Sequence, residues 1–261
     1  RLSGGEEVRA GAVILAMGST PHQPTELGYG TDTRVITNLE LEGRWDDVPG
    51  EKVTIVGCVG SRRDGAGCSR YCCESMVGQA LRLRGMGKKV RVLYRDMRTF
   101  SRQAEELYEE AARQGVQFLR YPDIPPEEAV RIEDGAVRVR DELLGADVRI
   151  PTDLLVLATG LRPPEENVSQ QLKVSHSEDG FLLEKHPKLG PVEAGSPGIF
   201  LAGTAQGPKD VRESLAQGLA TAAKAAALLA KDHIEKEPIT AQLDLEKCIF
   251  CGRCVPVCPF G

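Results

Sequence analysis

The sequence predicts an α/β protein made of doubly wound parallel sheets, with the beginning of a small cysteine-rich domain at its C-terminal end. Two observations lead to this prediction. Short apolar runs that end in glycine alternate with helical patterns along most of the chain, as in sheets whose parallel strands are joined by helices. In addition, four of the eight cysteines stand close together near the last residue, and this spacing indicates a separate unit.

Each element is expected from a local pattern, taken in chain order. Apolar, mostly β-branched runs predict buried strands over residues 12–16, 52–59, 89–95, 116–120, 153–158 and 199–203. Apolar residues at helical spacing, or long alanine-rich stretches, predict helices over 74–84, 101–115 and 211–231. Alternating apolar and charged residues predict a small antiparallel meander over 127–151. Segments rich in proline and glycine are expected to be a connector at 20–50 and a loop region at 181–198.

The length of the chain and its net charge limit the classes of function that it can have. The chain has 261 residues, enough for roughly two domains at ~150 residues each. Its net charge of −5 argues against nucleic-acid binding, because no basic surplus can neutralise a phosphate backbone. No apolar run approaches the ~20 residues of a membrane helix. Because the chain starts at Arg1 and stops within a cysteine motif, we expect it to be a piece of a longer protein.

The C-terminal cysteines read C-x2-C-x2-C-x3-C-P, which is the run of bacterial ferredoxins. They are Cys248, Cys251, Cys254 and Cys258. Thiolates at this spacing enclose one corner of a [4Fe-4S] cluster, and Gly252 lets the backbone turn close to the sulfurs. Zinc fits less well, because two C-x2-C pairs of a zinc site usually stand a dozen or more residues apart. We therefore expect a [4Fe-4S] site; in two-cluster ferredoxins the fourth cysteine serves the other cluster.

The first cysteine group follows a predicted strand and has a less familiar spacing. Its members are Cys58, Cys68, Cys72 and Cys73. Free cysteine is often simply buried, whereas four thiols within a short loop suit a metal cluster. Spacing alone leaves both interpretations open. The clustering of all eight cysteines favours metal sites in a reducing cytoplasm over a secreted disulfide scaffold.

Two βα turns are candidates for nucleotide contacts. Residues 57–60 (Gly-Cys-Val-Gly) stand where G-x-G-x-x-G would bind a pyrophosphate, but one glycine is missing and a cysteine-rich loop follows. A pyridine-nucleotide site there is therefore not favoured. Residues 199–204 form a strand and a Gly turn before a helix. That turn could present N–H groups to a ligand, or it could be an ordinary βα connection.

The assembled motifs resemble known families. Residues 158–160 (Ala-Thr-Gly) and 199–203 (Ile-Phe-Leu-Ala-Gly) are similar to flavin-domain signatures of two-dinucleotide-domain flavoproteins such as thioredoxin reductase. More specifically, four stretches resemble the HdrA-like family, the flavin subunits of heterodisulfide reductase and their bacterial relatives: the first cysteine group, residues 96–98, residues 202–210 and the ferredoxin run. The fold implied is an FAD/NAD(P)-binding fold of thioredoxin-reductase type, with the start of a bacterial-type ferredoxin domain.

The resemblance implies cofactors, partners and site residues. Family members bind FAD and several [4Fe-4S] clusters, and they act as flavin subunits of soluble complexes whose other subunits donate and accept electrons. The implied cluster ligands are both cysteine groups. The implied flavin contacts are Gly18, Thr159, Gly160, Gly203, Thr204, Lys209 and Asp210. No catalytic residue is assigned, and a homodimer is one further assembly to test. Family members often carry a lysine after the paired cysteines, but residues 74–78 have none, which weakens the expectation of electron bifurcation.

Four domain segments follow from this interpretation. They are the remainder of an FAD domain with a connector (1–50), a nucleotide-binding-like domain with an inserted cluster (51–155), the C-terminal part of the FAD domain (156–235) and a truncated ferredoxin domain (236–261). The expected function is electron transfer between FAD and [4Fe-4S] clusters in a cytoplasmic heterodisulfide-reductase-type complex. Two alternatives are an NAD(P)H-dependent flavin reductase with a ferredoxin tail, and a non-catalytic iron–sulfur relay.

Overall fold

The largest of the four sheets in the described residues is parallel, and its central strands are buried on both faces. In the computed structural model, which describes residues 7–63, 65–165, 168–233 and 241–258, five strands follow the order β3-β10-β4-β5-β6. Their bounds are β3 (Val35–Thr37), β10 (Leu154–Thr159), β4 (Lys52–Val59), β5 (Lys89–Tyr94) and β6 (Gln117–Arg120). The inner strands β4 and β10 are covered on both faces and are almost continuous apolar runs, as in other parallel sheets, whereas the edge strand β6 is partly exposed.

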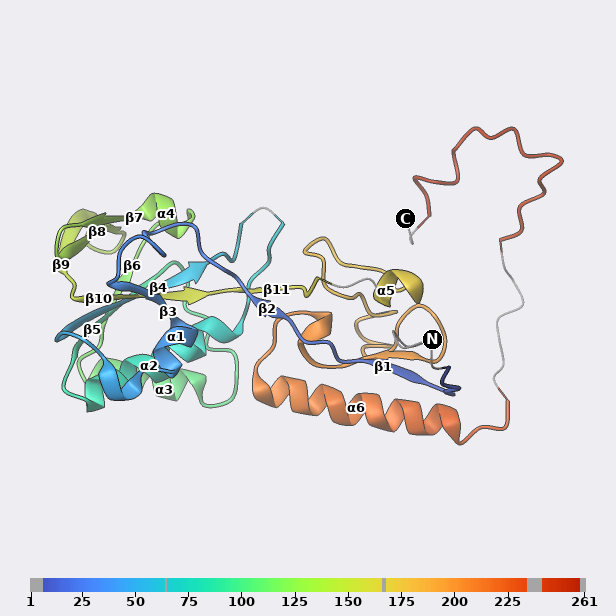
Figure 1. Cartoon of the computed structure of the whole chain (residues 1–261), viewed down its shortest axis with the longest axis horizontal. Coiled ribbons are helices and arrows are strands. Elements are labelled where there is room, and N and C mark those ends of the chain that lie inside the picture. The colour runs from blue at the N-terminus through green and yellow to red at the C-terminus, as the bar shows by residue number, and fades with distance from the viewer. Residues whose placement is uncertain (1–6, 64, 166–167, 234–240, 259–261) are drawn as a thin grey trace.

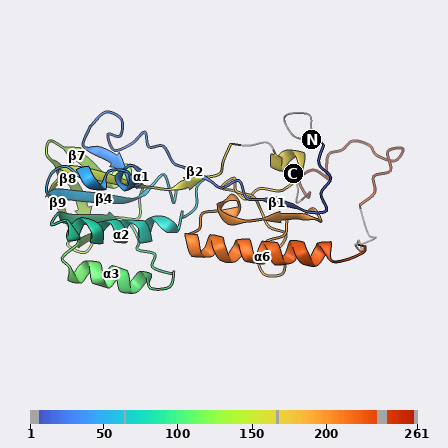
Figure 2. The same ribbon diagram turned by 60° about the horizontal axis from the view of Figure 1, so that its bottom comes forward.

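Each face of this sheet carries its own layer (Figures 1 and 2). Helices α2 (Tyr71–Gly85) and α3 (Ala104–Arg113) cover one face, where Ile55, Met76 and Leu83 belong to one buried cluster. The antiparallel meander lies on the other face, and the short helix α4 (Pro126–Ala129) precedes it in the chain. It consists of β7 (Val130–Glu133), β8 (Ala136–Asp141) and β9 (Ala146–Pro151). The predicted meander is therefore confirmed.

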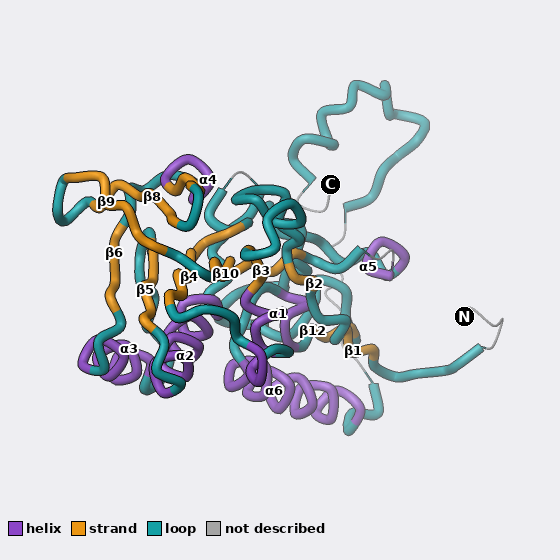
Figure 3. Tube along the Cα trace, turned by 60° about the vertical axis from the view of Figure 1, so that its left-hand side comes forward, coloured by secondary structure: helices purple, strands orange, loops and turns teal. Residues whose placement is uncertain are grey.

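A smaller part of the fold lies beside the large sheet. Strands β1 (Val13–Leu15) and β12 (Ile199–Leu201) pair in parallel, with Ile14 opposite Phe200. The short 3-10 helix η2 (Gly203–Gln206) and the long helix α6 (Val211–Leu229) follow β12, and α5 (Val168–Gln171) lies on a loop. Helices α2, α3 and α6 lie along the same side of the molecule (Figure 3).

The two parts are joined by a pair of short antiparallel strands, β2 (Thr20–Pro21) and β11 (Leu161–Arg162). One strand leaves the smaller part and the other returns to it (Figure 1). Residues 241–258 form no helix or strand and lie away from the sheets. Among the residues that the structure describes, no helix is long and apolar enough to span a membrane.

The predicted strands and long helices are confirmed, but the connector over 20–50 is not simply a loop. It holds β3, the helix α1 (Asn38–Glu42) and the 3-10 helix η1 (Trp45–Asp47). Strand β3 pairs with β10, so this segment supplies the edge of the large sheet. Strand β10 also continues in that sheet to Thr159, past the boundary expected at residue 155. A three-residue strand gives too short a pattern to stand out among turn-forming residues.

Candidate functional site

The first cysteine group lies at the carboxyl end of β4, where open parallel sheets bind their ligands. Cys58 is 4% exposed and has a φ of +62°, a left-handed conformation that costs a non-glycine residue about 1–3 kcal/mol. Such strain persists only where the surroundings fix it. Gly60 and Arg62 also have positive φ angles. The backbone therefore turns sharply directly after the strand.

Two buried serines close the loop that separates the cysteines. The hydroxyls of Ser61 and Ser69 are 2.8 Å apart, and Ser69 also accepts the backbone N–H of Leu161 at 2.9 Å. Gly160 packs directly on both hydroxyls, so a Cβ at this position would collide with Ser61. The loop is thereby fixed against the end of β10.

The paired cysteines lie in the first turn of α2 rather than before it. The sequence predicted this helix from residue 74, whereas the structure begins it at Tyr71. Cys72 and Cys73 are both buried, and the N-cap residue Arg70 provides no side-chain cap. The partial positive charge of a helix N-terminus favours anionic groups. This placement therefore favours negatively charged sulfur.

The four thiols lie close enough to affect one another electrostatically. Burial, followed by the neighbouring Cys73 thiol, raises the pKa of Cys58 to about 11. A hydrogen bond between the adjacent thiols raises the pKa of Cys72 and lowers that of Cys73. Cys68 accepts the backbone N–H of Arg70 at 3.4 Å. No group of three or more potential ligands within the described ranges is already arranged around a metal ion, so binding would have to draw these sulfurs together.

Arginine side chains surround this loop. Arg62, whose side chain is 17% exposed, lies 3.5 Å from Asp96 and 3.4 Å from Asp123. Arg95 pairs with Asp123 and donates to the Arg62 carbonyl at 2.7 Å. The Arg62 charge acts against the rise in the Cys58 pKa that burial causes. Four thiols, a helix N-terminus and nearby guanidinium groups fit an anionic iron–sulfur cluster.

The predicted flavin contacts fall in two places. In the smaller part, Gly18 follows β1 and Gly203 follows β12, both with positive φ angles. A Cβ on Gly18 would lie 3.9 Å from the Thr204 hydroxyl, so the two parallel strand ends bring Gly18 and Thr204 together. Lys209 is half-buried, which lowers its pKa, and its Nζ donates to the Gly207 carbonyl at 3.3 Å.

Asp210 forms the N-cap of α6. Its carboxylate accepts the Glu213 backbone N–H at 2.6 Å, and the Glu213 carboxylate accepts the Asp210 N–H at 3.3 Å. This reciprocal pair is a capping box. It accounts for Asp210 structurally, and the contact with flavin remains a prediction.

Thr159 and Gly160 lie at the end of β10, beside the cysteine loop, and not at the turn after β12. Thr159 is fully buried. Its hydroxyl and its backbone N–H both donate to the Asn38 side-chain oxygen, at 3.2 and 3.0 Å, and its carbonyl accepts the Tyr71 hydroxyl at 2.8 Å. The structure therefore separates this predicted pair from Gly18 and Thr204. Asn38 was not expected, because it lies in the segment interpreted as a connector.

One ion pair connects the cysteine loop with the turn before α6. The Arg70 guanidinium lies 2.5 Å from the Glu213 carboxylate and 4.6 Å from the centre of the Phe100 ring. Arg70 follows Cys68 and precedes the paired cysteines, whereas Glu213 belongs to the capping box with Asp210. The two candidate cofactor regions are therefore adjacent. No local pattern in the sequence signals this contact between distant segments.

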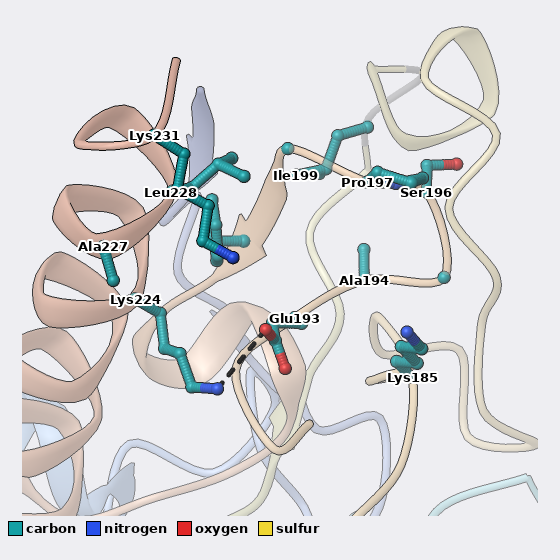
Figure 4. Close-up of a pocket in the computed structure, with 13 residues that line it drawn as sticks. Lys185, Glu193, Ala194, Ser196, Pro197, Ile199, Lys224, Ala227, Leu228 and Lys231 are labelled. Atoms are coloured by element: carbon teal, nitrogen blue, oxygen red, sulfur yellow. Dashed lines mark hydrogen bonds and ion pairs between the residues drawn. The ribbon is translucent and has the colours of Figure 1, made fainter. Parts of the chain in front are cut away.

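A separate cavity of about 650 Å³ lies between the second half of α6 and residues 193–200. Lys185, Lys224 and Lys231 line it, and Lys224 pairs with Glu193 at 3.5 Å (Figure 4). The three lysines are exposed. None of the predicted cofactor residues lines this cavity. It therefore adds nothing to the candidate site.

The chain matches two family models and several curated proteins. The model for pyridine nucleotide-disulphide oxidoreductases matches residues 1–225, and the model for 4Fe-4S binding domains matches residues 241–261. An A-type iron-sulfur subunit of CoB–CoM heterodisulfide reductase from Methanopyrus kandleri is 38% identical over 98% of this chain and 43% of its own length. The A-type subunit of the H2:CoB-CoM heterodisulfide,ferredoxin reductase from Methanothermobacter marburgensis is 39% identical over 98% of this chain and 42% of its own length.

The comparisons also bear on the fold and the cofactors. Thioredoxin reductase from T. acidophilum superposes with a TM-score of 0.55, covering 84% of this chain and 64% of its own, at 16% identity. This confirms the predicted fold. The predicted cofactors, FAD and [4Fe-4S] clusters, are confirmed by the two family matches together with the heterodisulfide reductase relatives. The chain spans less than half the length of those curated relatives.

Proposed function

The chain belongs to the pyridine nucleotide-disulphide oxidoreductase family, and on this basis we propose that its protein transfers electrons between FAD and [4Fe-4S] clusters within a heterodisulfide-reductase-type complex. The strongest support is the loop after β4. Four thiols, those of Cys58, Cys68, Cys72 and Cys73, follow one another between the end of β4 and the first turn of α2. A dinucleotide-binding fold would hold a pyrophosphate at this position. The loop provides thiol ligands instead.

We assign the chain's own residues as follows. The four loop cysteines would hold one [4Fe-4S] cluster, and Cys248, Cys251 and Cys254 would hold a second, with Cys258 as the remaining ligand of the ferredoxin run. Bound FAD exchanges electron pairs, whereas a [4Fe-4S] cluster exchanges single electrons. Arg62 and the N-terminus of α2 stabilise negative charge at the loop. The glycine turn after β12 lets a ligand approach the backbone closely, and Lys209 places a cation beside that turn.

The arrangement of the two regions supports transfer between them. Arg70 extends from the cysteine loop to the capping box that precedes α6. Gly203, Thr204 and Lys209 precede the same capping box. A flavin held at that turn and a cluster held at the loop would therefore face each other across one ion pair. Burial of the thiols excludes water from the loop. Fixed protein dipoles, rather than water, would then stabilise the charge of a bound cluster.

No observation favours an NAD(P)H-dependent reductase. The end of β4, at residues 57–60, is tightly packed: a Cβ at Gly57 would lie 2.9 Å from the Met76 sulfur, and the loop that follows is closed by Ser61 and Ser69. A pyrophosphate would have to displace these contacts. We further infer that donor and acceptor subunits bind the protein and that it works in the cytoplasm, whose reducing conditions keep eight clustered cysteines as thiols. A homodimer and electron bifurcation are not included in the proposal.

The test is the iron and acid-labile sulfide content of the anaerobically purified full-length protein. A Cys72→Ser/Cys73→Ser double variant should lose about four iron ions, one cubane, and should keep its flavin. The matched control, Cys248→Ser/Cys251→Ser, should lose the cluster of the ferredoxin run and keep the inserted one.

Equal iron in the wild type and the Cys72→Ser/Cys73→Ser variant would contradict the inserted cluster. Absence of flavin in the full-length protein would instead favour a non-catalytic relay. Direct reduction of the flavin by NAD(P)H without any other subunit would favour the flavin-reductase alternative.

A further inference from the structure

Tyr121 is a buried residue that the proposed function does not use. It follows β6 directly, and its backbone N–H donates to the Tyr94 carbonyl at 2.9 Å. Its side chain is fully buried in the cluster between the large sheet and the meander, together with Val56 and Val139. The phenol hydroxyl donates to the Gly57 carbonyl at 2.9 Å. Tyr121 therefore contacts the backbone immediately before Cys58.

The same hydroxyl also contacts the Cys58 thiol. Burial raises the pKa of Cys58, and the nearby hydroxyl of Tyr121 acts against this rise. Burial and this thiol raise the pKa of Tyr121 far above its usual value.

Tyr121 and the paired cysteines approach Cys58 from opposite faces of the large sheet. Tyr121 belongs to the buried cluster on the meander face of the sheet, whereas Cys72 and Cys73 belong to the cluster on the face covered by α2. The left-handed backbone of Cys58 lies between them. The residues on both faces therefore fix the direction of this one side chain.

The phenol has one hydrogen and two acceptors within reach, the Gly57 carbonyl and the Cys58 sulfur. A neutral thiol accepts a hydrogen bond only weakly, so the phenol donates to the Gly57 carbonyl. A thiolate is charged and accepts more strongly. Ligation of iron deprotonates cysteine, and each added electron makes the cluster and its sulfurs more negative. The balance between the two acceptors therefore depends on charge at Cys58.

We propose that Tyr121 donates a hydrogen bond to the Cys58 sulfur in the cluster-bound protein and thereby favours the reduced state of the inserted cluster. The inference rests on the proposed function, because it requires a cluster at this loop. It makes Tyr121 a positioning residue, which acts on the cluster through one of its ligands. Hydrogen bonds to cluster sulfurs are a general means of setting reduction potentials.

The experiment compares Tyr121→Phe with wild type in the full-length protein, prepared without air. The ring, and with it the packing, is retained, and only the hydroxyl is lost. The midpoint potential of the inserted cluster is measured by a titration followed with electron paramagnetic resonance. The signal of that cluster is the one missing from the Cys72→Ser/Cys73→Ser variant. In Tyr121→Phe we expect the equilibrium constant for reduction of the inserted cluster to fall about tenfold. For a one-electron couple this lowers the midpoint potential by about 59 mV.

Tyr108→Phe is the matched control. Tyr108 lies on α3, and its hydroxyl faces Tyr94 rather than a cysteine. It should leave the midpoint unchanged. A second measurement covers the case in which Tyr121→Phe fails to retain iron: wild-type protein labelled throughout with 3-fluorotyrosine, a more acidic and therefore stronger donor, should show a raised midpoint.

The outcomes separate the two proposals. An unchanged or raised midpoint in Tyr121→Phe with full iron content overturns the role of Tyr121, as does an unchanged midpoint with the fluorinated residue. Full iron in the Cys72→Ser/Cys73→Ser variant overturns the proposed function itself. A purely structural role for Tyr121 would lower thermal stability without moving the potential.

Discussion

At the scale of single residues, the candidate site depends on a few positions with unusual backbone or packing requirements. Cys58 adopts a left-handed backbone, and Gly160 packs against the hydroxyls of Ser61 and Ser69. The sequence identified the cysteines through their spacing and through family resemblance. It could not identify Gly160 as a packing residue or Tyr121 as a neighbour of Cys58. These contacts join segments far apart in the chain, and no local pattern encodes them.

Replacing Gly160 with alanine should therefore destabilise the protein by roughly 1–3 kcal/mol, the usual cost of overpacking. The added methyl group would displace the serine pair that closes the cysteine loop. Chemical denaturation measures the change. Gly78→Ala is the matched control, because Gly78 lies in α2 with nothing within 4 Å of its added Cβ. The control should be stabilising by about 0.5–1 kcal/mol. Equal stability of both variants would contradict this description of Gly160.

At the scale of elements, the order of strands and helices followed from the sequence, whereas their arrangement did not. Apolar runs and glycine turns indicated nearly every element of the large sheet. The edge strand β3 was missed because three residues give no clear pattern, and its stability comes from pairing with β10. The early start of α2 was missed because cysteines and Tyr71 carry no helix-start signal of the usual kind.

The starts of β4 and β10 are held together by one carboxylate. Asp153 accepts the backbone N–H groups of Glu51 and Lys52, each at 2.9 Å, and these bonds hold its pKa below the usual value. A lowered pKa in the folded state stabilises the protein above the pKa of the unfolded state. That contribution is lost as the pH falls through the folded-state value.

Asp153→Asn should accordingly lower the free energy of unfolding at neutral pH, on the order of 1 kcal/mol. The difference from wild type should be complete above about pH 5 and should shrink below about pH 4. Denaturation over this pH range is the measurement. Asp46→Asn, at an exposed position in η1, controls for the removal of one carboxylate charge from the surface. A difference for Asp153→Asn that stays constant with pH would contradict the assignment.

At the scale of the whole molecule, the fold places two candidate cofactor regions side by side. The sequence predicted both regions but not their contact, because the pair Arg70–Glu213 joins a loop of the large sheet to a helix of the smaller part. Thr159 and Gly160, for which the sequence also predicts flavin contacts, lie beside the cysteine loop and apart from Gly18 and Thr204. A sequence signature predicts a local conformation, whereas the fold determines which of the two candidate cofactor regions that segment lies beside.

Arg70→Gln should loosen this contact with little effect on overall stability. Ion pairs with partly exposed partners contribute about 0–1 kcal/mol, and here the two side chains are 41% and 30% exposed. We expect faster amide hydrogen exchange in residues 61–70 and an almost unchanged unfolding free energy. Arg113→Gln, which breaks exposed pairs on α3, should leave exchange in that loop unchanged. Identical exchange in Arg70→Gln and wild type would show that the pair does not connect the two parts.

The closed serine pair over the cysteine loop has a consequence for how the protein is made. Cys58, Cys72 and Cys73 are buried, and Ser61 and Ser69 fix the intervening loop against Gly160. A cluster delivered by an assembly factor needs access to all of these sulfurs at once. In the folded chain, this delivery would therefore require the contact between Ser61 and Ser69 to open.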